Sequence, residues 1–253
     1  MIKRQSLIIL LSCALAFFFN ACSHWTPAGP IVYLPERHGD PTDHARQQAA
    51  LHRLIPAKPL IGMEMFTRDQ QNHLNAWQQG RIGLDRLFAR TNFNAAWQTF
   101  GLGYRQILTI AEQNEIPVLA LNAPRSVTSP VARGQEVPSE LRHYLRHGFR
   151  KPPGGFQNFA TLLPAEHMGQ EALRRYYEAM FIWDATMARA LIDSAWRGPT
   201  LVLLGRGHAS PKFGVPALVH RAKPRRPQWV WDESGFRRIS DRFTGTNRAP
   251  HRR

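Results

Sequence analysis

The chain has 253 residues, of which 43% are hydrophobic, and this is enough for one sizeable domain with a real core. Lysine and arginine total 33 against 18 acidic residues, so the formal net charge is +15. Such a charge favours anionic partners such as lipid head groups, phosphates and carboxylates. We expect no nucleic-acid partner, because the N-terminus predicts an exported protein.

Residues 1–22 predict a lipoprotein signal peptide. A positively charged start, residues 1–4, precedes an apolar stretch over residues 7–19 that is too short for an ordinary membrane span. This stretch ends at Cys22 after a small residue, as bacterial lipoprotein signals do. We favour Cys22 as the lipidated residue over Cys13, which follows a shorter apolar stretch. The alternatives are a cleaved secretory peptide and an uncleaved anchor.

Lipidation of Cys22 would leave no thiol in the mature domain. It would therefore exclude a disulfide, a zinc-thiolate site and a cysteine nucleophile. The acyl chains would hold the protein at a membrane without a spanning helix. Ser23 after the cysteine then predicts an outer-membrane lipoprotein, on the periplasmic or the surface face of the cell envelope.

Residues 23–29 predict a short tether, and residues 30–243 predict a single domain. Its strand-like apolar runs are 30–34, 59–66, 116–122, 199–205 and 228–232. Its helical segments are 43–55, a segment that starts at Asp69, 94–114 and 170–196. This alternation predicts an α/β fold with a mainly parallel sheet flanked by helices.

Two further segments stand outside this alternation. Residues 126–169 are rich in Pro and Gly, with one short helix expected at 138–147. Together with the start of the long helix, they predict a helical lid or insertion at about 126–180. Residues 244–253 predict a disordered basic tail.

Polar residues follow four of the predicted strands at the points where those strands end. They are Glu36, His38, Glu64, Asn122 and His208. The ligand crevice of an open parallel sheet lies just beyond the carboxyl ends of its strands. We therefore expect these side chains to share one site.

Carboxylates and imidazoles at such a site suit two kinds of chemistry. Glu36, His38, Glu64 and His208 could hold a divalent metal with an open position for water, or act as catalytic residues if the chain is an enzyme. The plainer interpretation is that Glu36 and His38 are solvated loop residues.

Other residues fit the same site less specifically. Gly205 and Gly207 would let the backbone turn tightly before His208, or would belong to an ordinary strand-to-helix turn. Arg125 could clamp a carboxylate beside Asn122. The buried-type Glu64 could instead form a structural ion pair with Arg68 or Arg125.

Asp184 lies on the long helix among apolar neighbours. It could orient a histidine of the site, or it could be an exposed acid of the helix surface.

Aromatic and basic residues gather in the predicted lid. They are Tyr144, His167, Arg174, Arg175, Tyr176 and Tyr177. A tyrosine phenolate can ligate ferric haem iron, and arginines can pair with haem propionates. The plainer interpretation is that one tyrosine packs in the core and another lies at the surface.

Taken together, these motifs resemble the ChaN family of haem-binding bacterial lipoproteins, in the Tiki-like superfamily. The resemblance rests on six segments in the same order over about residues 30–220. They are Pro35-Glu36-Arg37-His38-Gly39-Asp40, Gly62-Met63-Glu64-Met65, Ala120-Leu121-Asn122-Ala123-Pro124-Arg125, Trp183-Asp184-Ala185-Thr186-Met187-Ala188, Gly205-Arg206-Gly207-His208 and Gly214-Val215-Pro216.

The resemblance implies an α/β fold with a helical lid, and haem bound through an axial tyrosine in a dimer that pairs two haems face to face. It also implies a role in haem or iron uptake, with an outer-membrane haem receptor as a possible partner. Tyr177 and Tyr176 are the first candidates for the ligand, followed by Tyr144. We expect a binding protein rather than an enzyme.

Two other hypotheses stay open. One is a metal-dependent hydrolase or protease of the Tiki-like type, which would use the Glu36, His38 and His208 cluster. The other is a basic surface protein that docks to anionic components of the envelope.

Overall fold

A computed structural model describes residues 28–97, 101–163, 169–232 and 235–240. The predicted signal peptide with Cys13 and Cys22, the residue His167 and the predicted tail at 244–253 lie outside these described residues. Within the described part of the chain, no helix is long and apolar enough to cross a membrane.

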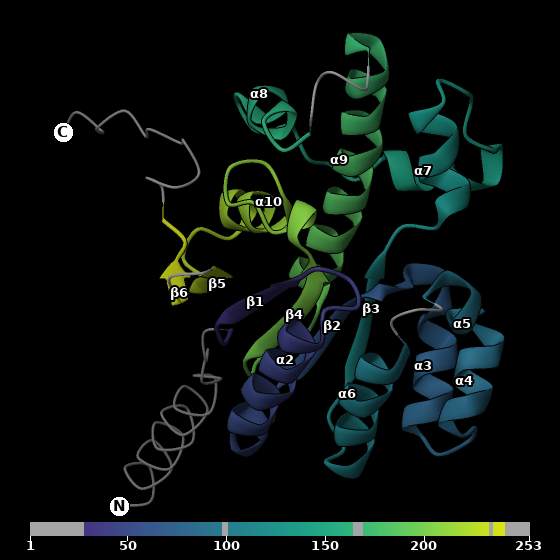
Figure 1. The fold of residues 1–253 in the computed structure, drawn as a ribbon, viewed down its shortest axis with the longest axis vertical. Helices are drawn as coiled ribbons and strands as arrows, with labels where there is room; N and C mark the ends of the chain where they lie inside the picture. Colours follow the sequence, from purple (N-terminus) through teal and green to yellow (C-terminus); the bar gives the residue numbers. More distant parts are fainter. Residues whose placement is uncertain (1–27, 98–100, 164–168, 233–234, 241–253) are drawn as a thin grey trace, which may run out of the picture.

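Six strands form one sheet in the order β3-β2-β4-β1-β5-β6 (Figure 1). The strands are β1 (Ile31–Glu36), β2 (Leu60–Thr67), β3 (Val118–Asn122), β4 (Thr200–Gly205), β5 (Gln228–Asp232) and β6 (Gly235–Arg238). Strands β1 to β5 run parallel to their neighbours, and β6 pairs antiparallel with β5. The predicted α/β fold with a mainly parallel sheet is confirmed.

Helices cover both faces of this sheet, which is why its central strands are apolar on both sides. In β4, Leu201 and Leu203 face one core, and Val202 and Leu204 face the other. The first core is covered by α2 (Pro41–Leu54), α3 (Gln71–Gln78), α4 (Leu84–Arg90), α5 (Phe93–Ala96) and α6 (Gly101–Gln113). The second is covered by α9 (Gln170–Asp193) and α10 (Val215–Ala222).

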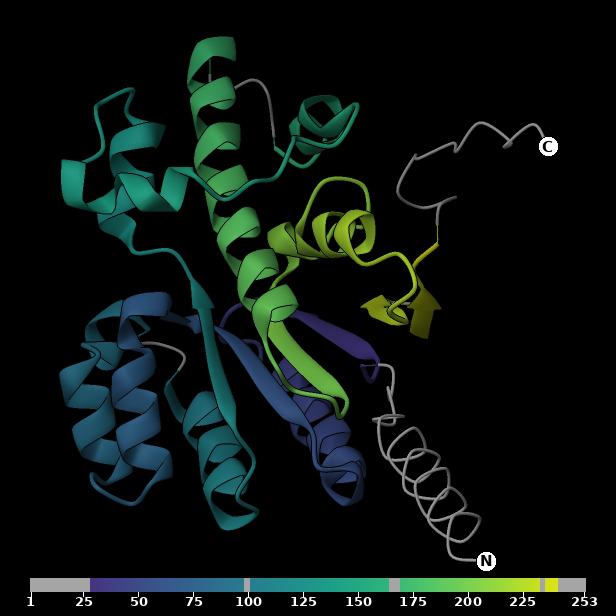
Figure 2. The ribbon, with the colours of Figure 1, turned by 180° about the vertical axis from the view of Figure 1, so that it is seen from behind.

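The segment predicted as a lid lies beyond the carboxyl ends of the strands. It contains α7 (Arg125–Ala132), the 3-10 helix η3 (Ser139–Leu145), α8 (Gly155–Ala160) and the first half of α9. Figure 2 shows these helices on either side of α9, above the sheet. Contacts of α9 with β3, α7, α8 and α10 join the lid to the rest of the fold.

Two predicted helices differ from the observed ones. The first begins at Pro41, because the Asp40 carboxylate accepts hydrogen bonds from the Thr42 and Asp43 amides and so caps the helix. Asp43 is therefore a buried residue of the first turn rather than the cap.

The segment predicted as one helix over 94–114 contains two helices, α5 and α6. The backbone at Trp97 leaves the helical region, with φ −131° and ψ 33°, so α5 ends there. Helices α4 and α10 and strand β6 were not predicted; each is eight residues or fewer, which leaves little periodicity to detect.

Candidate functional site

Three parallel strands bring three of the predicted residues to one edge of the sheet. Strand β1 ends at Glu36, directly opposite Gly205 at the end of β4. Glu64 lies on the neighbouring strand β2, and His208 follows β4 in the 3-10 helix η5 (Arg206–His208). Helix α9 adds Asp184 from the second face of the sheet.

The core of the site is a set of two carboxylate–imidazole pairs. His38 Nδ1 lies 2.7 Å from Glu36 Oε1, and His208 Nδ1 lies 2.7 Å from Asp184 Oδ1. The two Nε2 atoms both approach Glu64 Oε1, at 3.8 Å from His38 and 3.4 Å from His208. The other Glu64 oxygen accepts the Gly205 N–H at 2.5 Å. We call these five side chains the imidazole cluster.

Glu36 is the most heavily hydrogen-bonded member of the imidazole cluster. Besides His38, it accepts hydrogen bonds from Gln47 Nε2 at 2.7 Å and from the Tyr104 hydroxyl. His44 Nε2 lies 3.5 Å away, which is an electrostatic contact rather than a full hydrogen bond. Burial alone would raise the pKa of Glu36, but these donors outweigh it and lower the pKa to about 2.

The opposite carboxylate–imidazole pair is also ionised near neutral pH. Burial disfavours the charged imidazole of His208, but the Glu64 and Asp184 carboxylates outweigh burial and raise its pKa to about 9. Burial raises the pKa of Asp184 to about 6, against the opposing effect of His208. The pKa of His38 is also raised, because its contacts with Glu36 and Glu64 outweigh its burial.

Close packing holds these groups in place. A Cβ on Gly205 would lie 2.8 Å from His38 Nε2, so a larger residue there would displace the ring. The Trp97 ring meets His38 edge to face at 4.9 Å, and the Trp183 ring meets His208 at 6.0 Å. His38 keeps 31% of its side chain exposed, whereas its partners in the imidazole cluster are buried, so the cluster meets solvent at His38.

The arrangement can hold and exchange protons. Each imidazole has one nitrogen fixed by a carboxylate, which sets the direction in which the other nitrogen points. Glu64 stands between the Nε2 atoms of the two imidazoles. Such groups are suited to general acid–base work on a molecule that enters beside His38.

The predicted divalent-metal set finds no support in the described residues. No group of three or more His, Cys, Asp or Glu there is arranged to hold a metal ion, and this includes Glu36, His38, Glu64 and His208. The imidazoles instead use their Nδ1 atoms on carboxylates and meet a single oxygen of Glu64.

Two other predicted members do not join the imidazole cluster. The side chain of Asn122 accepts the N–H of Ala123 and so caps the turn after β3. Arg125 starts α7. Arg68 donates to the Ala120 carbonyl at 2.5 Å, so the expected ion pair of Glu64 with an arginine is replaced by the contacts of Glu64 with histidines.

Three residues that hold Glu36 were not predicted from the sequence: His44, Gln47 and Tyr104. His44 and Gln47 are buried polar residues of α2. Their spacing of four and seven residues from the helix cap at Asp40 places them on the face that also buries Leu51. Two polar residues on an otherwise apolar helix face could have indicated that this face contacts a polar site. No such pattern marks Tyr104, because a buried tyrosine in α6 looks like any core aromatic.

The tyrosines predicted as haem ligands lie on the lid. Tyr177 is buried among Phe156, Phe159 and Phe213, and its hydroxyl has no hydrogen-bond partner in the described structure. Tyr176 is half-buried on the same helix, with its ring 5.7 Å from that of Phe159.

Tyr144 is half-buried on η3, 4.4 Å from the His143 ring. Arg175 pairs with Glu171, and the Arg174 guanidinium lies over the Phe156 ring at 4.7 Å.

Comparisons with known proteins agree with this architecture. The family model described as "Haem-binding uptake, Tiki superfamily, ChaN" matches residues 27–219, which is most of the chain. The chain therefore belongs to the ChaN family of the Tiki superfamily. None of the curated proteins matches it.

Among solved structures, one described as cofacial haem binding to ChaN of Campylobacter jejuni is similar, with a TM-score of 0.63 and 19% identity over 84% of each chain. A toxin effector domain of Vibrio vulnificus, RRSP, has a TM-score of 0.46 at 14% identity, over 85% of this chain and 35% of that one. An erythromycin esterase mutant, EreC, has a TM-score of 0.46 at 12% identity, over 87% and 78%. The first likeness concerns the fold, and the other two are too remote to support a function.

Proposed function

We propose that this protein binds haem at its helical lid, with Tyr176 as the axial ligand, and serves haem or iron uptake. Membership of the ChaN family supports haem as the ligand. The observation that carries the choice of site is the position of Tyr176, which is half-buried, on the face of α9 that meets the strand ends.

Three residues of α9 define this face. Tyr176, Met180 and Trp183 follow one another at spacings of four and three, so they lie in line along the helix. Trp183 contacts the His208 ring, and a Cβ on Gly207 would lie 3.6 Å from the Met180 methyl. Burial raises the pKa of Tyr176, and the charge of Glu64 raises it further, which supports a phenol facing the imidazole cluster.

The other two tyrosines fit less well. The hydroxyl of Tyr177 is covered by the backbone of Gly155, so a flat ring could reach it only if α8 moved. Tyr144 lies on η3 rather than on α9. Burial, and then the charge of Asp69 rather than of a residue in the imidazole cluster, raise the pKa of Tyr144.

The lid has the chemistry that haem needs. Phe159, Met180 and Trp183 belong to one hydrophobic cluster with Tyr176 and would give apolar walls, and the buried Trp183 Nε1 has no hydrogen-bond partner in the described structure. Among the described residues, Arg174 has no acidic partner, so its guanidinium is suited to a propionate. Ferric haem would supply the iron centre, and this chain would supply the phenolate, the walls and the cation.

An absorbance titration with ferric haem tests the proposal. We expect saturation near one haem per chain with a tyrosinate-type spectrum, and loss of that spectrum in Tyr176→Phe. Tyr177→Phe is the matched control, because it removes the neighbouring hydroxyl from the same helix. An unchanged spectrum in Tyr176→Phe would show that the ligand is another residue. Size exclusion on the same samples tests the predicted haem-linked homodimer.

The hydrolase or protease hypothesis keeps one supporting observation, the two oriented imidazoles that face Glu64. If the cluster were catalytic, His208→Ala would abolish turnover of an ester or peptide substrate while haem binding stayed within about twofold. A metal assay on the unmodified protein and on the His208→Ala variant checks the metal-dependent form of this hypothesis. Stoichiometric metal that is present in the first and lost in the second would support a metal-dependent enzyme.

A further inference from the structure

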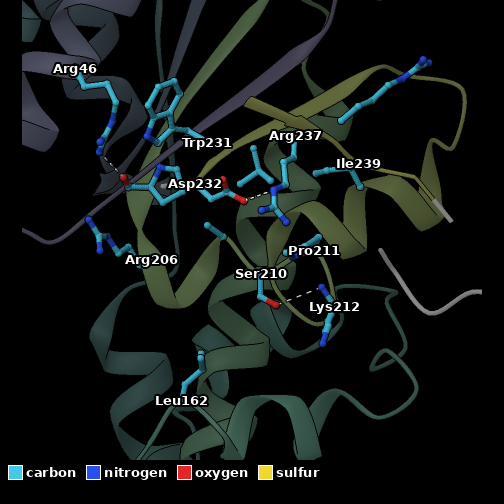
Figure 3. A pocket seen from close by; sticks show the side chains of 14 residues that line it. Arg46, Leu162, Arg206, Ser210, Pro211, Lys212, Trp231, Asp232, Arg237 and Ile239 are labelled. Atoms are coloured by element: carbon cyan, nitrogen blue, oxygen red, sulfur yellow. Dashed lines mark hydrogen bonds and ion pairs between the residues drawn. The ribbon is translucent and has the colours of Figure 1, made fainter. Parts of the chain in front are cut away.

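A cavity of about 800 Å³ lies beside the β5–β6 hairpin. None of its described lining residues belongs to the imidazole cluster. Figure 3 shows Arg46 and Arg206 on one side, Trp231 and Arg237 of the hairpin above, and the Ser210–Lys212 loop opposite. Leu162, which follows α8, closes the lower side. The volume is in the range of pockets that hold small molecules.

The charges around this cavity are strongly unbalanced. Five basic side chains line it, and Asp232 is the acidic one among its described lining residues. Asp232 pairs with Arg237 at 2.6 Å. The buried Asp43 lies behind the wall, where it binds both Arg46 and Arg206. Even with both acids counted, three positive charges remain in excess, which favours a multiply charged anion.

Two of the arginines are held in fixed positions. Asp43 is 2% exposed and also accepts the Arg37 N–H at 2.7 Å, so it is anchored in the fold. It orients the Arg206 side chain, of which 46% remains exposed, and the Arg46 guanidinium, which also lies 5.3 Å from the Trp231 ring centre. Guanidinium groups held in this way lose little entropy when they bind an oxyanion.

Apart from Ser210, the rest of the described lining is apolar. Trp231 and Leu162 stand on opposite sides of the opening, and Leu162 is 54% exposed although it is a large hydrophobic residue. Pro35, Ala209, Pro211, Val230 and Ile239 complete the apolar part. Apolar walls with a few polar groups placed among them are typical of sites for small organic ligands.

We propose that this cavity is a ligand site for a small organic phosphate. One phosphate monoester group carries a charge of about −1.5 to −2 at neutral pH, so a single group can neutralise most of the excess positive charge. Its apolar or aromatic body would lie against Trp231 and Leu162. The described lining contains no Tyr, His, Cys or Met, so it offers none of the usual axial ligands of haem iron. The site is therefore distinct from the proposed haem site on the lid.

Calorimetric titration of the full chain with 1-naphthyl phosphate tests this proposal. We expect saturation at one ligand per chain, and affinity at least about tenfold tighter than for inorganic phosphate or 1-naphthol, since each lacks one of the two recognised parts. Lys212→Glu should weaken binding by about tenfold or more, because it reverses an exposed charge of the lining. Arg225→Glu makes the same charge change outside the cavity and should stay within about twofold.

Three results of these calorimetric titrations would overturn the proposal. They are absence of saturable binding, equal affinity for inorganic phosphate, and equal losses in Lys212→Glu and Arg225→Glu. Binding to phosphatidylglycerol vesicles without binding to naphthyl phosphate would also overturn it, in favour of a membrane-docking face. A haem titration of Lys212→Glu separates the two sites: an unchanged spectrum is expected, and loss of haem binding would make the cavity part of the haem site.

Discussion

At the scale of single residues, Glu36 is held by side chains from three parts of the fold: His38 after β1, Gln47 of α2 and Tyr104 of α6. Glu36, Glu64 and His208 lie together because parallel strands all end at the same edge, which the apolar runs in the sequence already indicate. Tyr104 comes from a helix, and its contact with Glu36 depends on how closely α6 approaches α2. Periodicity shows which helix face is buried but not how near two helices lie.

Glu36 gives a pH prediction at this scale. Its folded pKa, about 2, lies below the ordinary 4.5, so its stabilising effect is fully present above pH 4.5 and is lost as the pH falls toward 2. Glu36→Gln should therefore lower the free energy of unfolding at pH 7 by on the order of 2–3 kcal/mol, and the difference should shrink below pH 4.5.

Urea unfolding of both proteins at pH 7, 4.5 and 3 measures this difference. Asp85→Asn serves as a control, since Asp85 forms an exposed ion pair with Arg105 and should change stability by less than about 1 kcal/mol. A Glu36→Gln effect that stays constant across this pH range would contradict the assignment.

At the scale of elements, the long strands and α9 were predicted well, because each buries an extended apolar pattern. The region between residues 84 and 101 was predicted poorly, because its helices are short. Gly103 lies in the middle of the segment predicted as a helix, where a glycine normally weakens the helix. In the structure it is the point at which α6 meets His44 of α2, and a Cβ there would clash with the imidazole ring.

Gly103→Ala should therefore lower the free energy of unfolding, whereas a change from glycine to alanine inside a helix usually raises it. Alanine normally stabilises a helix interior by about 1 kcal/mol relative to glycine, whereas here we expect a loss of about 1–3 kcal/mol from overpacking. Chemical denaturation gives the comparison, with Gly83→Ala as the control because a Cβ at Gly83 meets nothing within 4 Å. Combining Gly103→Ala with His44→Ala should recover part of the loss, and a stabilised Gly103→Ala would refute the contact.

At the scale of the whole molecule, the family and the fold could be predicted because six motifs occur in the family's order, although each motif alone is weak evidence. The cavity beside β5 and β6 could not be predicted. Arg46 and Arg237 are far in the sequence from the segment that carries Arg206 and Lys212, and only the packing of α2, that segment and the hairpin brings the four together. A formal charge of +15 says that anions will be attracted, but not where they bind.

At this scale, we predict that a lipid on Cys22 attaches the protein to a membrane. Cys22→Ala should abolish incorporation of labelled palmitate and release the protein from the membrane fraction, because the acyl chains at this residue would hold it there. Cys13→Ala should leave both unchanged. The reverse pattern would move the lipidation site to Cys13, and labelling of neither cysteine would favour a plain secretory peptide.

The direction of the strands has a consequence for how the protein would stand on a bilayer. The chain enters the fold at the amino end of β1, and the six residues of that strand carry it about 20 Å to the opposite edge. From Cys22 to Ala28 the backbone can reach no more than about 20 Å. A lipid at Cys22 would thus keep the amino edge near the lipid surface and turn the lid outward, where bound haem could be received or handed over without leaving the membrane.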